Sequence, residues 1–240
     1  MIRSAAISKQ GKRDYNEDSF LIKKNGNDFI AAVADGLGGQ GNGEICSKTA
    51  VDAVKELYLK DDDISKSLEE CFLGAQEAVM KKKEENIELT RMMTTLVLLR
   101  INRDSLAWGH VGDSRLYCFK DKKIVKRTLD HSVPQVLVKT GEIDESEIRH
   151  HPDRNRLLRT IGSEWSSSQF QLEEPESYRK NCQFLLCSDG FWEYIEDSDM
   201  EKTLNSSFTV SGWLKKMEKI ILENGKDSDM DNYTAVAVWI

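Results

Sequence analysis

The sequence has no long hydrophobic run, no paired cysteine motif and no excess of positive charge. No apolar run approaches the roughly 20 residues that cross a bilayer, and residues 1–7 lack the apolar core of a signal peptide. We therefore expect a cytoplasmic protein without a membrane partner. The formal net charge of −7 also argues against nucleic acid as the main partner, because binding a phosphate backbone requires a basic surface.

The five cysteines form neither a CxxC pair nor a Cys/His spacing typical of zinc sites. Such scattered cysteines predict reduced thiols. Cys187 stands beside Ser188 and Asp189, where a nucleophile is one interpretation, but the apolar run before it favours a small buried strand residue. The pair His150-His151 has no further ligand at zinc spacing, so a zinc site is the less favoured interpretation.

Internal repeats, low-complexity segments and an interdomain linker are also missing from the sequence. The chain has 240 residues, of which 39% are hydrophobic, and this is enough to bury a substantial core. We therefore predict a single domain over residues 1–240.

What the sequence does contain is a set of acids beside apolar runs. Asp35 ends one such run and is followed by glycines. Asp113 and Asp189 stand in similar positions, and Asp231 precedes the last apolar run. One Asp-Gly pair often marks only a turn, but four such acids from distant parts of the chain indicate a shared site. Hard cations such as Mg²⁺ and Mn²⁺ prefer carboxylate, carbonyl and water ligands.

The order of apolar runs predicts strands, two helices, many strands, two helices and one last strand. The simplest arrangement is two packed antiparallel sheets with helices outside each. We expect, in chain order, a hairpin over 19–35, helices over 43–59 and 65–85, an antiparallel meander over 94–128, a helix over 133–139 that Gly141 ends, a long excursion over 142–168, strands near 170–172 and 182–188, helices over 198–204 and 209–222, and a strand over 233–240.

Seven short segments together resemble the metal-dependent serine/threonine phosphatases of the protein phosphatase 2C family. In chain order they are residues 13–18, 35–39, Thr94-Thr95, 112–115, 130–132, 188–190 and Asp231-Asn232. Each is weak alone, but together they follow the family's order over nearly the whole chain. The resemblance implies an α+β fold, a four-layer αββα sandwich with two antiparallel sheets in the centre and helix pairs outside. Residues from 141 to about 168 resemble the flap of the bacterial members.

The resemblance also implies a centre of two Mn²⁺ or Mg²⁺ ions and a third, weaker ion. Asp35 would bridge the first two, and Gly36 would offer its carbonyl oxygen to one of them. Asp189 and Asp231 would complete the protein ligands of the other. Asp113 would hold the third ion together with Asp189.

By the same resemblance, the protein would hydrolyse phosphoserine and phosphothreonine in proteins through a water activated between the two cations. Arg13 would bind the substrate phosphate, and Glu17 and Asp18 would contact metal-bound water. The expected catalytic residues are Arg13, Asp35 and Asp189. The expected partners are phosphorylated proteins and, by analogy with bacterial systems, a cognate serine/threonine kinase.

The sequence departs from the family's pattern at two positions. Animal members carry a histidine directly after the Asp-Gly pair, and many bacterial relatives carry one three residues later; here these positions are Leu37 and Gln40. The proton donor could then be a metal-bound water or His131. Two other functions stay open, namely a binding module with the same fold but no turnover, and hydrolysis of another phosphoester such as a nucleotide.

Overall fold

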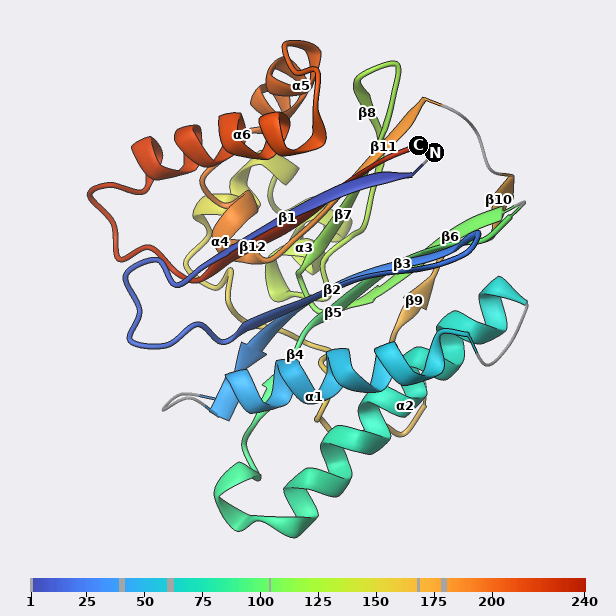
Figure 1. Ribbon diagram of the computed structural model, residues 1–240. Coiled ribbons are helices and arrows are strands. Elements are labelled where there is room, and N and C mark those ends of the chain that lie inside the picture. Colours follow the sequence, from blue (N-terminus) through green and yellow to red (C-terminus); the bar gives the residue numbers. More distant parts are fainter. Residues whose placement is uncertain (1, 39–41, 60–62, 104, 168, 178–180) are drawn as a thin grey trace.

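Two antiparallel β-sheets pack face to face, and a pair of helices covers the outer face of each (Figure 1). The computed structural model describes residues 2–38, 42–59, 63–103, 105–167, 169–177 and 181–240. This is the expected α+β sandwich with four layers. Within the described residues, no helix is both long and apolar enough to cross a membrane.

The first sheet joins the two ends of the chain, because its strands β1 and β12 are antiparallel neighbours. Helices α5 (Asp197–Asn205) and α6 (Val210–Asn224) lie on its outer face. The order of its strands is β1 (Arg3–Lys9), β12 (Tyr233–Trp239), β11 (Cys182–Cys187), β7 (Arg115–Lys120) and β8 (Lys123–Arg127).

The second sheet is built around the predicted hairpin of β2 and β3. Helices α1 (Asn42–Leu57) and α2 (Ile64–Glu85) cover it from outside. The order of its strands is β10 (Glu176–Ser177), β6 (Ser105–Val111), β5 (Leu96–Ile101), β3 (Asp28–Leu37) and β2 (Asp18–Asn25), while β4 (Met93–Thr94) pairs with β3 and β9 (Gln171–Leu172) pairs with β6.

Strand β3 shows why the apolar run before Asp35 is a strand in the middle of the fold. Successive side chains of a strand point to opposite faces. Ile30 and Ala32 therefore pack against α1 and α2, whereas Ala31 and Val33 belong to the cluster between the two sheets. Both faces are buried, as the unbroken apolar run predicts.

The predicted meander over 94–128 is wrong. Strands β5 and β6 pair in one sheet and β7 and β8 pair in the other, so the chain crosses between the sheets at residues 112–114. Periodicity identifies strands but not their partners, which is why the sequence did not reveal this crossing. At the crossing, Gly112 has a φ of +97°, a conformation that favours glycine. The crossing brings Asp113 to the seam between the sheets.

The other predicted elements are confirmed with small shifts of their ends. Helix α3 (Val133–Thr140) ends at Gly141, whose φ is +78°. The sequence analysis missed the one-turn helix α4 (Asp189–Trp192), the strand β10 and the short 3₁₀ helices at Ile87–Leu89 and Glu145–His150. It also did not separate β4 from β5.

The packing between the sheets yields a first prediction. Leu186 is fully buried there, and its replacement by alanine leaves a cavity in the core. We expect Leu186→Ala to lower the free energy of unfolding by about 2–5 kcal/mol in denaturant titrations. Leu222→Ala, at a leucine that is 49% exposed, is the matched control; equal losses in the two variants would contradict the assignment of the core.

Candidate active site

The predicted acids meet in a pocket of about 680 Å³ at one end of the sandwich. Residues from the ends of several strands and from the loops beside them form its wall. Seven of the eight predicted site residues line it: Arg13, Glu17, Asp35, Gly36, Asp113, Asp189 and Asp231. The eighth, Asp18, is buried and lies opposite Asp35 in the ladder of β2 and β3.

Two threonines, Thr94 at the end of β4 and Thr95 just before β5, fix the backbone of Asp35. The Thr94 hydroxyl donates to the Asp35 carbonyl oxygen at 2.8 Å, and the Asp35 N–H donates to the Thr95 hydroxyl at 3.0 Å. The Thr95 hydroxyl also hydrogen-bonds the hydroxyl of Ser114 at 2.7 Å. The Thr95 side chain therefore connects the backbone of Asp35 to the side chain of Ser114, the residue after Asp113.

Two glycines let the loop after β3 approach Glu17. A Cβ atom on Gly36 would lie 2.1 Å from the carbonyl oxygen of Gly43, so only glycine fits this crossing. The Gly36 N–H donates to the Glu17 carbonyl oxygen at 3.2 Å, and the Gly43 N–H donates to Glu17 Oε1 at 3.0 Å. These two contacts hold Glu17 beside the loop of Gly36.

Asp18 connects the two sheets below the pocket. Its Oδ2 accepts a hydrogen bond from the Ser188 hydroxyl at 2.8 Å, and the same hydroxyl accepts from the Thr234 N–H at 3.0 Å. The other oxygen, Oδ1, is buried without a hydrogen-bond partner. The pKa of Asp18 is raised to about 7, first by burial and then by the charges of Asp189 and Asp231.

The other acids of the site repel one another in the same way. Burial raises the pKa of Asp35 and of Asp113 well above the ordinary value, and the charge of Asp189 is the next cause in both cases. Burial also raises the pKa of Asp189, followed by the charge of Asp231. A concentration of buried carboxylates with raised pKa values typically marks a functional site.

These residues fit hard divalent cations. They supply carboxylate oxygens, the carbonyl of Gly36 and the unpartnered Oδ1 of Asp18. In the part of the chain that the structure describes, no three acidic, histidine or cysteine side chains form a closed metal cluster. The acids instead face one pocket from separate strands, an open arrangement that suits ions that keep several water ligands.

Arg13 lies in the pocket against one of the acids. Its Nε and Nη2 donate to the two carboxylate oxygens of Asp231, each at 3.0 Å, and its Nη1 donates to Asp229 at 3.1 Å. The hydrogen bond with Asp231 raises the pKa of the guanidinium. The structure therefore brings the predicted phosphate-binding arginine and a predicted metal ligand into direct contact.

Asn232 belongs to a segment that the sequence analysis singled out, but it had no predicted role. Its amide donates to the carbonyl oxygens of Gln10 and Tyr15 at 2.7 and 2.8 Å, and its Oδ1 accepts from the Glu17 N–H at 2.8 Å. It thus holds the loop that carries Arg13. Only the fold shows this role, because these partners are more than 200 residues away in sequence.

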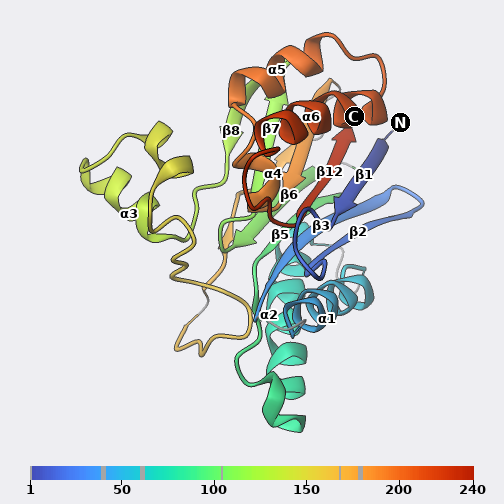
Figure 2. The same cartoon turned by 90° about the vertical axis from the view of Figure 1, so that its left-hand side faces the viewer.

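Helix α3 lies beside the sandwich, and the predicted flap begins directly after it, at residue 141 (Figure 2). At its base the Leu158 N–H donates to the His131 carbonyl oxygen at 2.8 Å, and residues Asn155 and Leu157 line the pocket.

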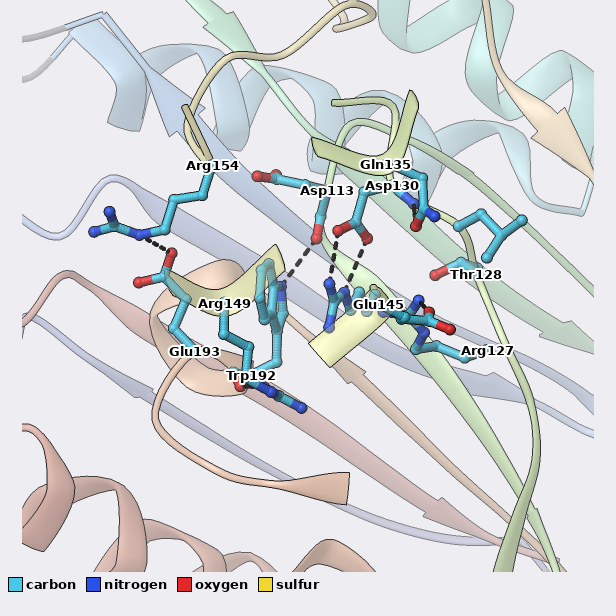
Figure 3. A network of polar contacts seen from close by, with 12 residues as sticks. Asp113, Arg127, Thr128, Asp130, Gln135, Glu145, Arg149, Arg154, Trp192 and Glu193 are labelled. Carbon is cyan, nitrogen blue, oxygen red and sulfur yellow. Dashed lines mark hydrogen bonds and ion pairs between the residues drawn. The ribbon is translucent and has the colours of Figure 1, made fainter. Parts of the chain in front are cut away.

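Arg154 pairs with Glu193 at 2.7 Å (Figure 3). The pKa of Glu193 is raised to about 7, first by burial and then by the charge of Asp189. The sequence analysis predicted neither residue, since nothing in sequence links positions 39 residues apart.

The structure argues against His131 as the proton donor. The side chain is buried and stacks on His110 with ring centroids 4.5 Å apart. Burial, followed by the neighbouring His110, lowers its pKa to about 3, so the ring is neutral near pH 7. Leu37 does line the pocket, whereas Gln40 lies outside the described residues.

The interpretation of the cysteines is confirmed. All five are free thiols, and burial raises the pKa of the Cys187 thiol far above its ordinary value, as expected of an unreactive strand residue. His150 and His151 belong to no metal-binding group of described residues.

Comparisons with known proteins agree with this geometry. A family model described as Protein phosphatase 2C matches residues 8–224. The serine/threonine phosphatase stp of Listeria monocytogenes is 31% identical over 233 residues, which cover 94% of this chain and 90% of that protein. The serine/threonine protein phosphatase PstP of Mycobacterium tuberculosis is 28% identical, over 95% of this chain and 44% of its own.

Solved structures show the same fold. The serine/threonine phosphatase Stp1 from Staphylococcus aureus aligns with a TM-score of 0.89 and 27% identity, over 100% of this chain and 95% of that one. The catalytic domain of PstP in complex with two manganese ions aligns with a TM-score of 0.84 and 27% identity, over 99% and 97% of the two chains.

The raised pKa of Asp18 predicts how pH changes the stability of the metal-free protein. Between about pH 4 and about pH 7, the folded protein holds a proton that the unfolded chain releases, so stability falls as pH rises through this window. Asp18→Asn removes this loss. In EDTA, we expect the variant to melt about 5 °C above the wild type at pH 8 and near it at pH 4.

Asp52→Asn, at an exposed position of α1, is the control and should follow the wild type at both pH values. The assigned pKa is wrong if thermal melts of Asp18→Asn depend on pH as steeply as those of the wild type.

Proposed function

The chain belongs to the protein phosphatase 2C family and is a metal-dependent serine/threonine phosphatase, and we propose that the pocket described above is its active site. The observation that carries this proposal is the convergence of Arg13, Asp35, Asp113, Asp189 and Asp231, from five distant parts of the sequence, on one pocket. In this site the protein hydrolyses phosphoserine and phosphothreonine side chains of protein substrates.

The acids of the pocket are the proposed ligands of the cations. Asp35, the Gly36 carbonyl, Asp189 and Asp231 would hold two Mn²⁺ or Mg²⁺ ions, and Asp113 with Asp189 would hold a third. The donor set supports this assignment, as does the related PstP structure with two manganese ions. Bound there, the cations would lower the pKa of a water molecule and offset the negative charge of the transition state.

The remaining residues of the pocket bind and orient the reactants. The planar fork of Arg13 can donate to two oxygens of a phosphate at once and stays charged at every working pH. The carboxylates of Glu17 and Asp18 would accept hydrogen bonds from water bound to the cations and so orient it. Leu37 has no titratable proton to give, so the departing serine or threonine oxygen would take its proton from water.

We also propose one phosphatase domain over residues 1–240, with a flap at about 141–168. The pairing of β1 with β12, which unites the two ends of the chain in one sheet, supports this extent. The free thiols support a cytoplasmic location. A cognate serine/threonine kinase is the proposed partner, since a phosphatase of this class needs an enzyme that phosphorylates its substrates.

The central prediction concerns turnover of a phosphothreonine peptide. The protein should release phosphate with Mn²⁺ and not with EDTA. Asp189→Asn should lower kcat by at least about 10²–10³-fold, since it removes a carboxylate that the cations would share and whose charge acts on Asp35 and Asp113. Asp52→Asn is the control and should retain activity.

Two outcomes would contradict the proposal. Metal binding without release of phosphate from any phosphopeptide would point to a binding module with the same fold. Faster turnover of nucleotides than of phosphopeptides would point to a different phosphoester as substrate.

A separate prediction tests Arg13. Arg13→Lys keeps the positive charge but loses the two-pronged donor, so we expect KM for the phosphopeptide to rise about tenfold. Arg3→Lys is the matched control, since Arg3 lies at the far end of β1. An unchanged KM in Arg13→Lys would exclude Arg13 from phosphate binding.

A further inference from the structure

Trp192 is buried beside the acids, and the mechanism proposed above gives this residue no role. It ends the one-turn helix α4 that Asp189 begins, and it is only 1% exposed. Its indole Nε1–H donates to the backbone carbonyl oxygen of Asp113 at 3.0 Å. One side chain therefore connects the segment of one predicted metal ligand to the backbone of another, which comes from a distant part of the sequence (Figure 3).

The backbone of Asp113 is held tightly on its other side as well. Gly112 has a φ of +97°, and a Cβ atom there would lie 2.6 Å from Thr95 Cγ2. The His131 N–H donates to the Gly112 carbonyl oxygen at 2.9 Å. Because these contacts hold Gly112, the hydrogen bond from the indole N–H fixes the orientation of the Asp113 carbonyl group. It thereby also fixes the direction in which the Asp113 side chain points.

A stacked arginine holds the indole ring itself. The Arg115 guanidinium carbon lies 3.4 Å from the centre of the Trp192 ring. Both oxygens of Asp130 accept hydrogen bonds from Arg115, at 2.9 and 2.7 Å, and the Tyr117 hydroxyl accepts a third at 3.1 Å. Because this ion pair is almost fully buried, the guanidinium is a rigid support for the ring.

The flap reaches the same residue from the opposite side. Arg149 donates to the carbonyl oxygen of Trp192 and pairs with Asp197 at 2.7 Å. Figure 3 shows Arg149 next to Trp192 and the pair of Arg154 and Glu193 close by. Trp192 thus lies where the flap, the helix of Asp189 and the crossing at Asp113 meet.

We propose that Trp192 is a positioning residue that holds Asp113 in the place, relative to Asp189, that the weaker third cation requires. This inference rests on the proposed function, because it assigns Asp113 and Asp189 to that ion. Trp192 touches no reacting group and acts through the backbone of Asp113. A residue that only fills the core would need the ring but not its N–H.

The test removes the N–H and keeps an aromatic ring. Trp192→Phe is compared with Trp213→Phe, because Trp213 is equally buried and its Nε1–H also donates to a backbone carbonyl, that of Met200, at 3.2 Å. Asp113→Asn serves as the reference for loss of the third ion. The measurement is Mn²⁺ binding to the full chain, followed by the electron paramagnetic resonance signal of free Mn²⁺, with thermal melts in EDTA.

We expect the wild type to bind Mn²⁺ in tight and weak steps. Trp192→Phe should weaken the weak step by about tenfold, as Asp113→Asn does, and leave the tight steps unchanged. Trp213→Phe should lose a similar amount of thermal stability and keep the wild-type isotherm. A wild-type isotherm in Trp192→Phe, an equal loss in Trp213→Phe or a wild type without a weak step would each overturn the inference.

A second variant covers the case in which phenylalanine fills the space too poorly for the protein to fold. Benzothienylalanine at position 192 keeps the bicyclic shape and removes only the N–H, and it should weaken the same step; an unchanged isotherm would overturn the inference. The proposed function fails separately, by absence of Mn²⁺-dependent phosphate release from the wild type.

Discussion

The mutual repulsion of buried carboxylates is the constraint on which the rest of this structure depends. Asp18, Asp35, Asp113 and Asp189 all lose solvation in the fold, and their charges raise one another's pKa values. Such an arrangement is unfavourable without a compensating charge. It persists because the packing of two sheets and four long helices determines where the strand ends lie. The repulsion is in turn the source of affinity for a divalent cation, which relieves it.

Hydrogen bonds across the seam between the sheets convert this packing into a defined site. The Ser188 hydroxyl joins Asp18 of one sheet to Thr234 of the other, and Thr95 joins Asp35 to Ser114 at the crossing. Each bond involves a short side chain with little rotational freedom, so little entropy is lost in holding it. The acids are therefore positioned by rigid strand ends rather than by mobile loops.

The sequence could reveal the acids but not the contacts that arrange them. Asp35 and Asp189 each follow an apolar run, and this local pattern can be recognised in the sequence alone. The crossing at Gly112 has no such signal, since strand periodicity is the same whether the next strand joins the same sheet or the other. The contacts of Trp192 with Asp113 and of Arg154 with Glu193 escape prediction for a related reason. Both contacts join residues that are distant in sequence and that only the tertiary fold brings together.

The contact between Arg13 and Asp231 links the two kinds of binding in the proposed site. Three nitrogens of the guanidinium are engaged by Asp231 and Asp229, so the face that would receive a phosphate is already in use. Both oxygens of Asp231 likewise accept hydrogen bonds from Arg13, so a cation bound to this carboxylate competes with the guanidinium. A cation bound to Asp231 would neutralise this carboxylate in place of Arg13. The guanidinium could then separate from Asp231 without leaving an unpaired negative charge behind. Cation binding and phosphate binding are then cooperative by electrostatics alone.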